Sequence, residues 1–182
     1  MGKLIVISGP SGVGKGTVLG IAMKARNDLR FSVSATTRDP RPDEEDGVHY
    51  HFINRERFEE MISAGEFLEY SEHNKNYYGT PRGQALEKME QGHALLDIEP
   101  NGAGQVKKNM PEAILIFIMP PSMEELERRL RGRGDTPEDQ IEIRMKRAIW
   151  EMDQRGWYDH VLVNKDANVC AEEILKIIAD KA

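Results

Sequence analysis

The chain has 182 residues, of which 39% are apolar and 31% charged, and its formal net charge is −6. This length suits one compact domain with insertions, and the acidic balance argues against a protein that coats nucleic-acid phosphates. The single cysteine, Cys170, allows no internal disulfide, and no apolar run reaches the roughly 18 residues of a membrane-spanning helix. We therefore expect a cytoplasmic protein whose partners are neither nucleic acid nor membrane.

The first predicted elements are those of an α/β unit. Residues 4–8 form a short β-branched apolar run, which predicts a buried strand. A glycine-rich turn follows at 9–14, and apolar residues at helical spacing predict a helix from 15 to about 26. A strand, a glycine loop and a helix in this order are typical of the start of a parallel α/β fold.

The alternation of strands and helices resumes in the second half of the chain. The continuous apolar run at 114–118 is typical of a strand that is covered on both faces. Ser122 and Glu125 have the spacing of a capping box, and Thr136 is followed by proline, as at the start of a helix. The other elements predicted here are strands at 94–99 and 160–164 and helices at 122–131, 136–154 and 171–179.

Between the first helix and the strand at 94–99 the pattern is different. Short strands and one helix are mixed there, which predicts a small insertion over 34–82 inside the parallel core. The predicted elements are strands at 31–34, 48–52 and 67–70 and a helix at 55–64 that Gly65 ends. The acidic run at 43–46 is interpreted as a solvated loop.

Residues 9–15 match the phosphate-loop pattern up to its lysine. The glycines let backbone N–H groups turn inward around anionic oxygens, the next helix points its positive end there, and Lys15 adds a full charge. The pattern usually continues with a hydroxyl residue that helps to hold Mg²⁺; here Gly16 takes that position and Thr17 follows. The sequence therefore predicts binding of a nucleoside triphosphate by Gly9, Pro10, Ser11, Gly12, Val13, Gly14, Lys15, Gly16 and Thr17.

A phosphate loop alone serves switches, motors and kinases, and a kinase also needs a pocket for the acceptor anion. The insertion offers one. Arg38 and Arg41 lie three apart on a proline-containing loop, and arginine forks pair bidentately with phosphate. Tyr50 and Tyr78 can donate phenolic hydrogen bonds to the same group, and the Glu69 carboxylate can accept from the ring N–H and amino group of guanine.

On these residues the chain resembles the guanylate kinases. The matching segments are 7–15, 31–41, 76–80, 96–99, 120–122, 131–134 and 163–164, which follow family order through essentially the whole chain. The resemblance implies an α/β fold with a three-layer P-loop kinase core and a parallel sheet (1–33, 83–124 and 150–182). It also implies a small mixed α/β GMP-binding insertion (34–82) and a helical lid (125–149).

The resemblance also implies roles, position by position. Arg38, Arg41, Tyr50 and Tyr78 resemble the ligands of the GMP phosphate, and Ser34, Glu69, Thr80 and Glu99 the guanine-recognising set. Arg133 and Arg144 resemble lid arginines that clamp the ATP phosphates, and Asn164 lies where the family contacts adenine. Together with Lys15, Arg38 and Asp97, the two lid arginines form the expected catalytic set.

Asp97 and Glu99 are two residues apart on a predicted strand, so both are expected on one face, at the ligand end of the sheet. Asp97, with Thr17, is the candidate for holding Mg²⁺ through water. Glu99 is the candidate for contacting the amino edge of guanine. Where the family usually has Asp, a variable residue and Gln-Gly, residues 99–102 read Glu-Pro-Asn-Gly, which departs from the pattern.

Two clusters have a second interpretation. The arginines at 128, 129, 131 and 133 suit a solvated helix face, but the glycines at 132 and 134 favour a closing lid. His49, His51 and His73 could suggest zinc, although a solvated strand face is the favoured interpretation.

The expected reaction is Mg²⁺-dependent transfer of the ATP γ-phosphoryl group to GMP, and to dGMP, by a monomer or homodimer. Two alternatives stay open: a non-catalytic guanylate-kinase-like binding module, and a related P-loop kinase that acts on a sugar phosphate.

Overall fold

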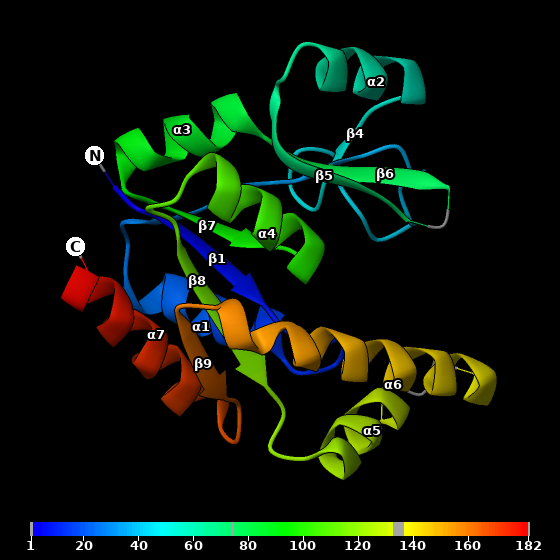
Figure 1. The fold of residues 1–182 in the computed structure, drawn as a ribbon, viewed down its shortest axis with the longest axis vertical. Coiled ribbons are helices and arrows are strands. Elements are labelled where there is room, and N and C mark those ends of the chain that lie inside the picture. Colours follow the sequence, from blue (N-terminus) through cyan, green and yellow to red (C-terminus); the bar gives the residue numbers. More distant parts are fainter. Residues whose placement is uncertain (1, 74, 133–136, 182) are drawn as a thin grey trace. The chain divides into compact units, whose positions relative to one another are not determined.

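The computed structural model describes residues 2–73, 75–132 and 137–181 and has an α/β fold with two sheets (Figure 1). The five-stranded sheet has the order β2-β7-β1-β8-β9, in which β2 runs parallel to β7 and β8 parallel to β9. The four-stranded sheet has the order β4-β3-β6-β5. The expected fold class, α/β with a parallel sheet and a second, mixed sheet, is thereby confirmed.

Contacts divide the chain into two compact units. The first unit comprises residues 1–5, 28–96 and 101–113, and the second unit residues 6–27, 97–100 and 114–182. Most of the first unit consists of β2 (Leu29–Phe31), β3 (Ala35–Thr36), β4 (His51–Phe52), α2 (Arg55–Ser63), β5 (Phe67–His73), β6 (Asn76–Pro81), α3 (Arg82–Gln91), β7 (His93–Asp97) and α4 (Pro100–Asn109). Most of the second consists of β1 (Leu4–Ser8), α1 (Lys15–Ala25), β8 (Ile114–Met119), α5 (Met123–Arg131), α6 (Glu138–Asp153), a 3₁₀ turn (Gln154–Trp157), β9 (His160–Val163) and α7 (Ala167–Lys181).

The strands of the parallel sheet follow the burial expected of their sequences. All five residues of β1 are buried, and so are the first five of β8. β9 lies at the end of the strand order and alternates instead, with Val161 and Val163 each 44% exposed. Helices α1 and α7 pack side by side in the second unit (Figure 1).

The mixed sheet has its own small aromatic core. Strand β3 pairs parallel with β4 and antiparallel with β6, which in turn pairs antiparallel with β5. Phe58 of α2 is fully buried, and its ring stacks on Phe67 at 4.3 Å and on Tyr77 at 5.0 Å between centroids. A Cβ at Gly79 would lie 3.0 Å or less from atoms of this cluster, so the close approach of β6 requires glycine there.

We expect Phe58→Ala to destabilise the protein by about 3–5 kcal/mol, since it removes a fully buried ring and leaves a cavity. Urea unfolding followed by circular dichroism measures this free energy. Val48→Ala is the control: Val48 is 55% exposed, and its truncation should change the free energy by less than about 0.5 kcal/mol. A loss at Phe58 as small as that of the control would contradict the packing described here.

Several strand predictions in the insertion are wrong. The expected strand at 31–34 is interrupted, because β2 ends at Phe31 and β3 begins only at Ala35. The strand expected at 48–52 is reduced to His51–Phe52, since a turn occupies the preceding residues. Strand β6 and helices α3 and α4 were not predicted.

The other helix starts are close to those expected, but α7 begins at Ala167 where a start at 171 is expected. Two caps also differ from the prediction. Ser122 accepts the N–H of Glu125 at 3.2 Å, as in a capping box, but the Glu125 carboxylate pairs with arginines instead of closing the box. Helix α6 begins at Glu138 with Pro137 as its N-cap, and the expected cap Thr136 lies outside the described residues. Within the described ranges, no helix is both long and apolar enough to cross a membrane.

Candidate active site

The phosphate loop lies in the second unit, between β1 and α1. Gly9, Gly12 and Gly14 have φ values of 150°, 85° and 97°, which L side chains rarely adopt. The glycines are therefore needed for the loop to curve. Beside the loop lies a pocket of about 270 Å³ lined by Ser11, Gly12, Gly14, Lys15, Gly16, Thr17 and Asp97. The structure thus brings together the loop residues and Asp97.

Lys15 is held at this pocket by the loop itself. Its ammonium donates to the Gly9 carbonyl at 2.7 Å and to Pro10 at 3.5 Å, and lies 3.9 Å from the Asp97 carboxylate. Burial raises the pKa of Asp97, and the Lys15 charge opposes that rise. Lys15 is therefore positioned as a cation at the mouth of a glycine-rich anion cradle.

The expected Mg²⁺ ligands fit such a role. Thr17 is exposed on the first turn of α1 and lines the same pocket as Asp97. A hydroxyl and a carboxylate would supply hard oxygen ligands of the kind that Mg²⁺ prefers, directly or through water. Among the described residues, no group of three or more His, Cys, Asp or Glu side chains could hold a metal. His49 accepts the Glu45 N–H, and His51 hydrogen-bonds Gln84.

A cationic cluster occupies the first unit. The Arg38 guanidinium lies 5.6 Å from the Tyr50 ring centroid and 5.7 Å from that of Phe52. The rings of Tyr50 and Tyr78 meet edge to face at 6.0 Å, and Tyr78 is a hydrogen-bond partner of Arg38. Three of the four residues predicted to bind the GMP phosphate are therefore adjacent.

Glu44 fixes Arg38 in this cluster. Its carboxylate accepts from Arg38 Nη2 at 2.8 Å and from the Arg41 backbone N–H at 2.8 Å. These bonds hold the pKa of Glu44 at about 2, so the pair persists while pH falls through the ordinary range of Glu and is lost only near pH 2. Three residues of the acidic run at 43–46 are exposed, as expected of a solvated loop, whereas Glu44 is half-buried and is a structural part of the arginine loop.

The other predicted GMP-phosphate and guanine residues have different surroundings. Arg41 is exposed and contributes its backbone to the Glu44 contact. Ser34 is half-buried, and its carbonyl accepts the His51 N–H at 2.8 Å.

Glu69 is a buried carboxylate in the first unit, with an exposed fraction of 5%. The Thr80 hydroxyl donates to its Oε1 at 2.6 Å. Its Oε2 would lie 2.4 Å from a Cβ at Gly102, so a side chain at that position would displace the Glu69 carboxylate. Glu69 and Thr80 are therefore brought together as predicted, on the paired strands β5 and β6.

Glu99 has a different position from the one expected. Strand β7 ends at Asp97, so the prediction that Asp97 and Glu99 share one strand face is wrong. Glu99 is exposed and pairs with Arg147 of α6 at 2.6 Å, and Arg147 also contacts the buried Glu151 at 3.1 Å. Burial raises the pKa of Glu151, and Arg147 opposes that rise.

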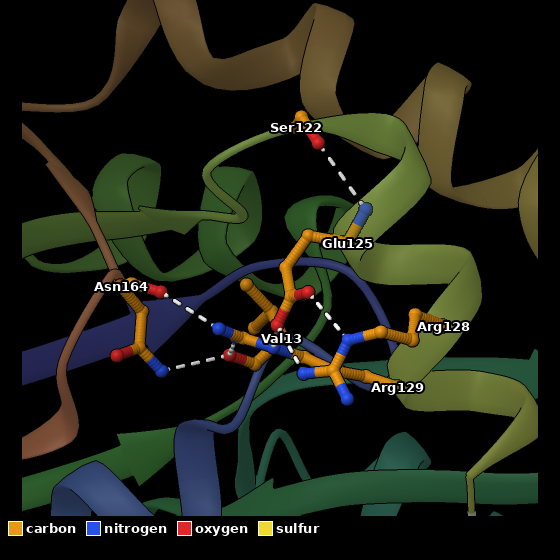
Figure 2. A network of polar contacts seen from close by, with 6 residues as sticks. All are labelled: Val13, Ser122, Glu125, Arg128, Arg129 and Asn164. Carbon is orange, nitrogen blue, oxygen red and sulfur yellow. Dashed lines mark hydrogen bonds and ion pairs between the residues drawn. The ribbon is translucent and has the colours of Figure 1, made fainter.

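The lid arginines separate into different environments. Arg133 lies outside the described residues, and Arg144 is half-buried on α6. Of the arginines on α5, Arg128 and Arg131 are exposed; Arg128 pairs with Glu125 of its own helix, and Arg131 with Glu127 and with Glu138 of α6. Arg129 also pairs with Glu125, and its guanidinium reaches the phosphate loop (Figure 2). The Asn164 amide donates to the same loop carbonyl, that of Val13, at 2.8 Å.

The sequence analysis did not predict the contacts that Glu44, Arg129 and Arg147 make. The sequence signal for Glu44 is its distance of three residues from Arg41 in a turn-forming segment. For Arg129 the signal is weaker, since only the rotation of α5 decides which arginine of a cluster faces inward.

A parallel α/β sheet with a phosphate loop between its first strand and helix defines the class of phosphate-loop nucleotide-binding proteins. A family model described as guanylate kinase matches residues 1–181. The guanylate kinase of Prochlorococcus marinus subsp. pastoris is 49% identical over 177 residues, which cover 97% of this chain and 96% of that protein. That of Clostridioides difficile is 48% identical over 181 residues, covering 99% and 88%.

A solved structure gives the same result. The crystal structure of guanylate kinase from Anaplasma phagocytophilum has a TM-score of 0.78 and 35% identity, covering 99% of this chain and 86% of that one. The chain belongs to the guanylate kinase family. The resemblance seen in the sequence and the expected enzyme class are both confirmed by these matches.

Proposed function

We propose that the protein transfers the γ-phosphoryl group of MgATP to GMP, and also to dGMP, giving ADP and GDP or dGDP, in the cytoplasm. The observation that carries the acceptor assignment is the buried Glu69 carboxylate in the unit that also holds the Arg38 cluster. Guanine presents an N–H and an amino group side by side, which matches an acceptor-only carboxylate. Adenine and uracil lack that donor pair.

In this proposal the phosphate loop and Lys15 bind the ATP phosphates, and Arg38, Arg41, Tyr50 and Tyr78 bind the GMP phosphate. Arg133 and Arg144 neutralise charge on the transferring group. When bound, Mg²⁺ offsets the charge of the ATP phosphates, with Thr17 and Asp97 as its ligands through water. The protein residues position two anions in line and stabilise the charge that spreads over the phosphoryl oxygens. No covalent intermediate with the protein is required.

An assay of ADP release with four acceptors separates this proposal from its alternatives. We expect GMP to support turnover at least about 100-fold better than AMP, UMP or a sugar phosphate, because only guanine pairs fully with Glu69. Turnover with the sugar phosphate alone would favour the other kinase class. No ADP release with any acceptor would favour a binding module.

A pair of variants tests the base assignment in the same assay. Glu69→Gln should raise the KM for GMP by at least about tenfold, because an amide offers one acceptor oxygen in place of two. Glu72→Gln is the matched control, since Glu72 is exposed three residues further along β5 and pairs with Arg55. Equal KM values for the two variants would contradict the role of Glu69.

A further inference from the structure

The Val13 carbonyl of the phosphate loop accepts two side-chain hydrogen bonds from distant segments. Arg129 Nη1 of α5 donates at 3.0 Å and Asn164 Nδ2, just after β9, donates at 2.8 Å (Figure 2). Val13 is fully buried and Asn164 is 4% exposed, so the Asn164 bond is shielded from water, and the Arg129 bond is partly buried. A buried carbonyl with two donors, one of them charged, is strongly fixed in direction.

The direction of this carbonyl determines what the loop presents to an anion. The C=O and N–H of one planar trans peptide point in opposite directions, so holding the Val13 oxygen outward turns the Gly14 N–H to the other side. Gly14 lines the 270 Å³ pocket, and its φ of 97° allows this orientation. A reversed peptide would direct a carbonyl oxygen at the phosphates.

Arg129 is itself held from three sides. Its Nε donates to Glu125 Oε1 at 2.8 Å, and its Nη2 donates to the Asn164 backbone carbonyl at 3.1 Å. The two donors are therefore joined to each other as well as to Val13. The neighbouring Leu130 also packs on the loop. Its Cδ2 lies so close to Gly12 that a Cβ at Gly12 would be only 2.7 Å from it.

We propose that Arg129 and Asn164 are positioning residues of the phosphate loop, which hold the Val13–Gly14 peptide with its N–H toward the triphosphate. The inference rests on the proposed function, since it takes the loop to bind ATP. It gives Asn164 a role through the loop, distinct from the adenine-side contact expected from the sequence. Arg129 acts in the same way, through a main-chain group and not through the nucleotide.

Steady-state kinetics of Arg129→Met and Asn164→Leu test the proposal. Both variants keep the side-chain volume but lose the donor to Val13. We expect the KM for ATP to rise at least about tenfold while the KM for GMP stays within about twofold of the wild-type value. Arg129→Lys, which keeps one donor and the charge, should lie between wild type and Arg129→Met.

Arg128→Met is the matched control. Arg128 is adjacent on α5, carries the same charge and shares the Glu125 carboxylate with Arg129, but its side chain is 74% exposed and its contacts described here do not include Val13. Its KM for ATP should remain within about twofold of wild type.

Competition by inorganic tripolyphosphate separates a loop effect from a contact with the base. If the residues act through the loop, Arg129→Met and Asn164→Leu weaken the binding of tripolyphosphate and the binding of ATP by the same factor. Weaker binding of ATP with unchanged binding of tripolyphosphate would overturn the proposal. Equal rises in the KM for ATP and the KM for GMP would also overturn it. If Arg129→Met does not fold, as judged by circular dichroism, Arg129→Lys and Asn164→Leu decide.

The outcome of the wild-type assay keeps the two claims apart. Wild-type protein without ADP release from ATP and GMP contradicts the proposed function. An active wild type with variants that match Arg128→Met contradicts only the role of Arg129 and Asn164.

Discussion

Lys15→Ala should lower kcat for GMP phosphorylation by about a thousandfold or more, because it removes the cation that the loop holds at the triphosphate. Lys15 lies between the Gly9 carbonyl, at 2.7 Å, and the Asp97 carboxylate, at 3.9 Å. Without the ammonium, the Asp97 carboxylate loses the cation 3.9 Å away, and the loop has less positive charge to offer the phosphates. Single-turnover measurements with saturating ATP and GMP report the loss in the chemical step.

Two controls accompany this measurement. Lys24→Ala changes an exposed lysine in the last turn of the same helix and should leave kcat within about twofold of wild type. Lys15→Ala should unfold at nearly the same urea concentration as wild type, since Lys15 is on the surface of the pocket and not in the core. A Lys15 variant with near-normal turnover would remove the basis for assigning catalysis to this loop.

The phosphate loop could be predicted because its chemistry is local. Residues 9–15 carry the glycines, the lysine and the flanking apolar strand within one short segment, and the observed φ values require glycine at Gly12 and Gly14. A strand such as β8 can be predicted in the same way, because it is apolar throughout and buried. In these segments local sequence and tertiary burial agree.

The missed elements are those in which local sequence and tertiary structure disagree. Strand β6 contains Gly79 and ends at Pro81, two residues that disfavour a strand. Gly79 is nevertheless required, because Phe67 and Phe58 leave no room for a Cβ. Helix α4 includes glycines at 102 and 104, so its pattern is weak, and Gly102 is explained only by the close approach of Glu69.

The residues of the candidate site also differ in how far the local sequence predicts them. Arg38, Tyr50 and Tyr78 could be grouped from the sequence only through a family pattern, since they come from segments up to 40 residues apart. Glu44 and Arg129 act on main-chain groups and on other side chains, and such contacts leave little trace in a single sequence. The pairing of Glu99 with Arg147 depends on where β7 ends, which the alternation of residues did not determine.

Arg38→Ala should raise the KM for GMP by about 10- to 100-fold, with a much smaller change in the KM for ATP, because it removes the proposed bidentate ligand of the acceptor phosphate. Arg38→Lys should recover only part of this loss, since an ammonium cannot pair as a fork or stack as a guanidinium does near the rings of Tyr50 and Phe52. Initial rates with each substrate varied in turn measure both constants.

Arg57→Ala provides the comparison within the same unit, because Arg57 is exposed on α2 and pairs only with surface glutamates among the contacts described. Its KM for GMP should match wild type, which would exclude a general effect of lost positive charge.

A second variant, Glu44→Gln, tests whether Arg38 must be held in place: it keeps Arg38 but removes the carboxylate that fixes its guanidinium at 2.8 Å. If Arg38 acts as a preorganised phosphate ligand, the KM for GMP rises in Glu44→Gln as well, by less than in Arg38→Ala. An unchanged KM in both variants would mean that the acceptor phosphate binds elsewhere, whereas a rise in Arg38→Ala alone would show that Arg38 binds it without help from Glu44.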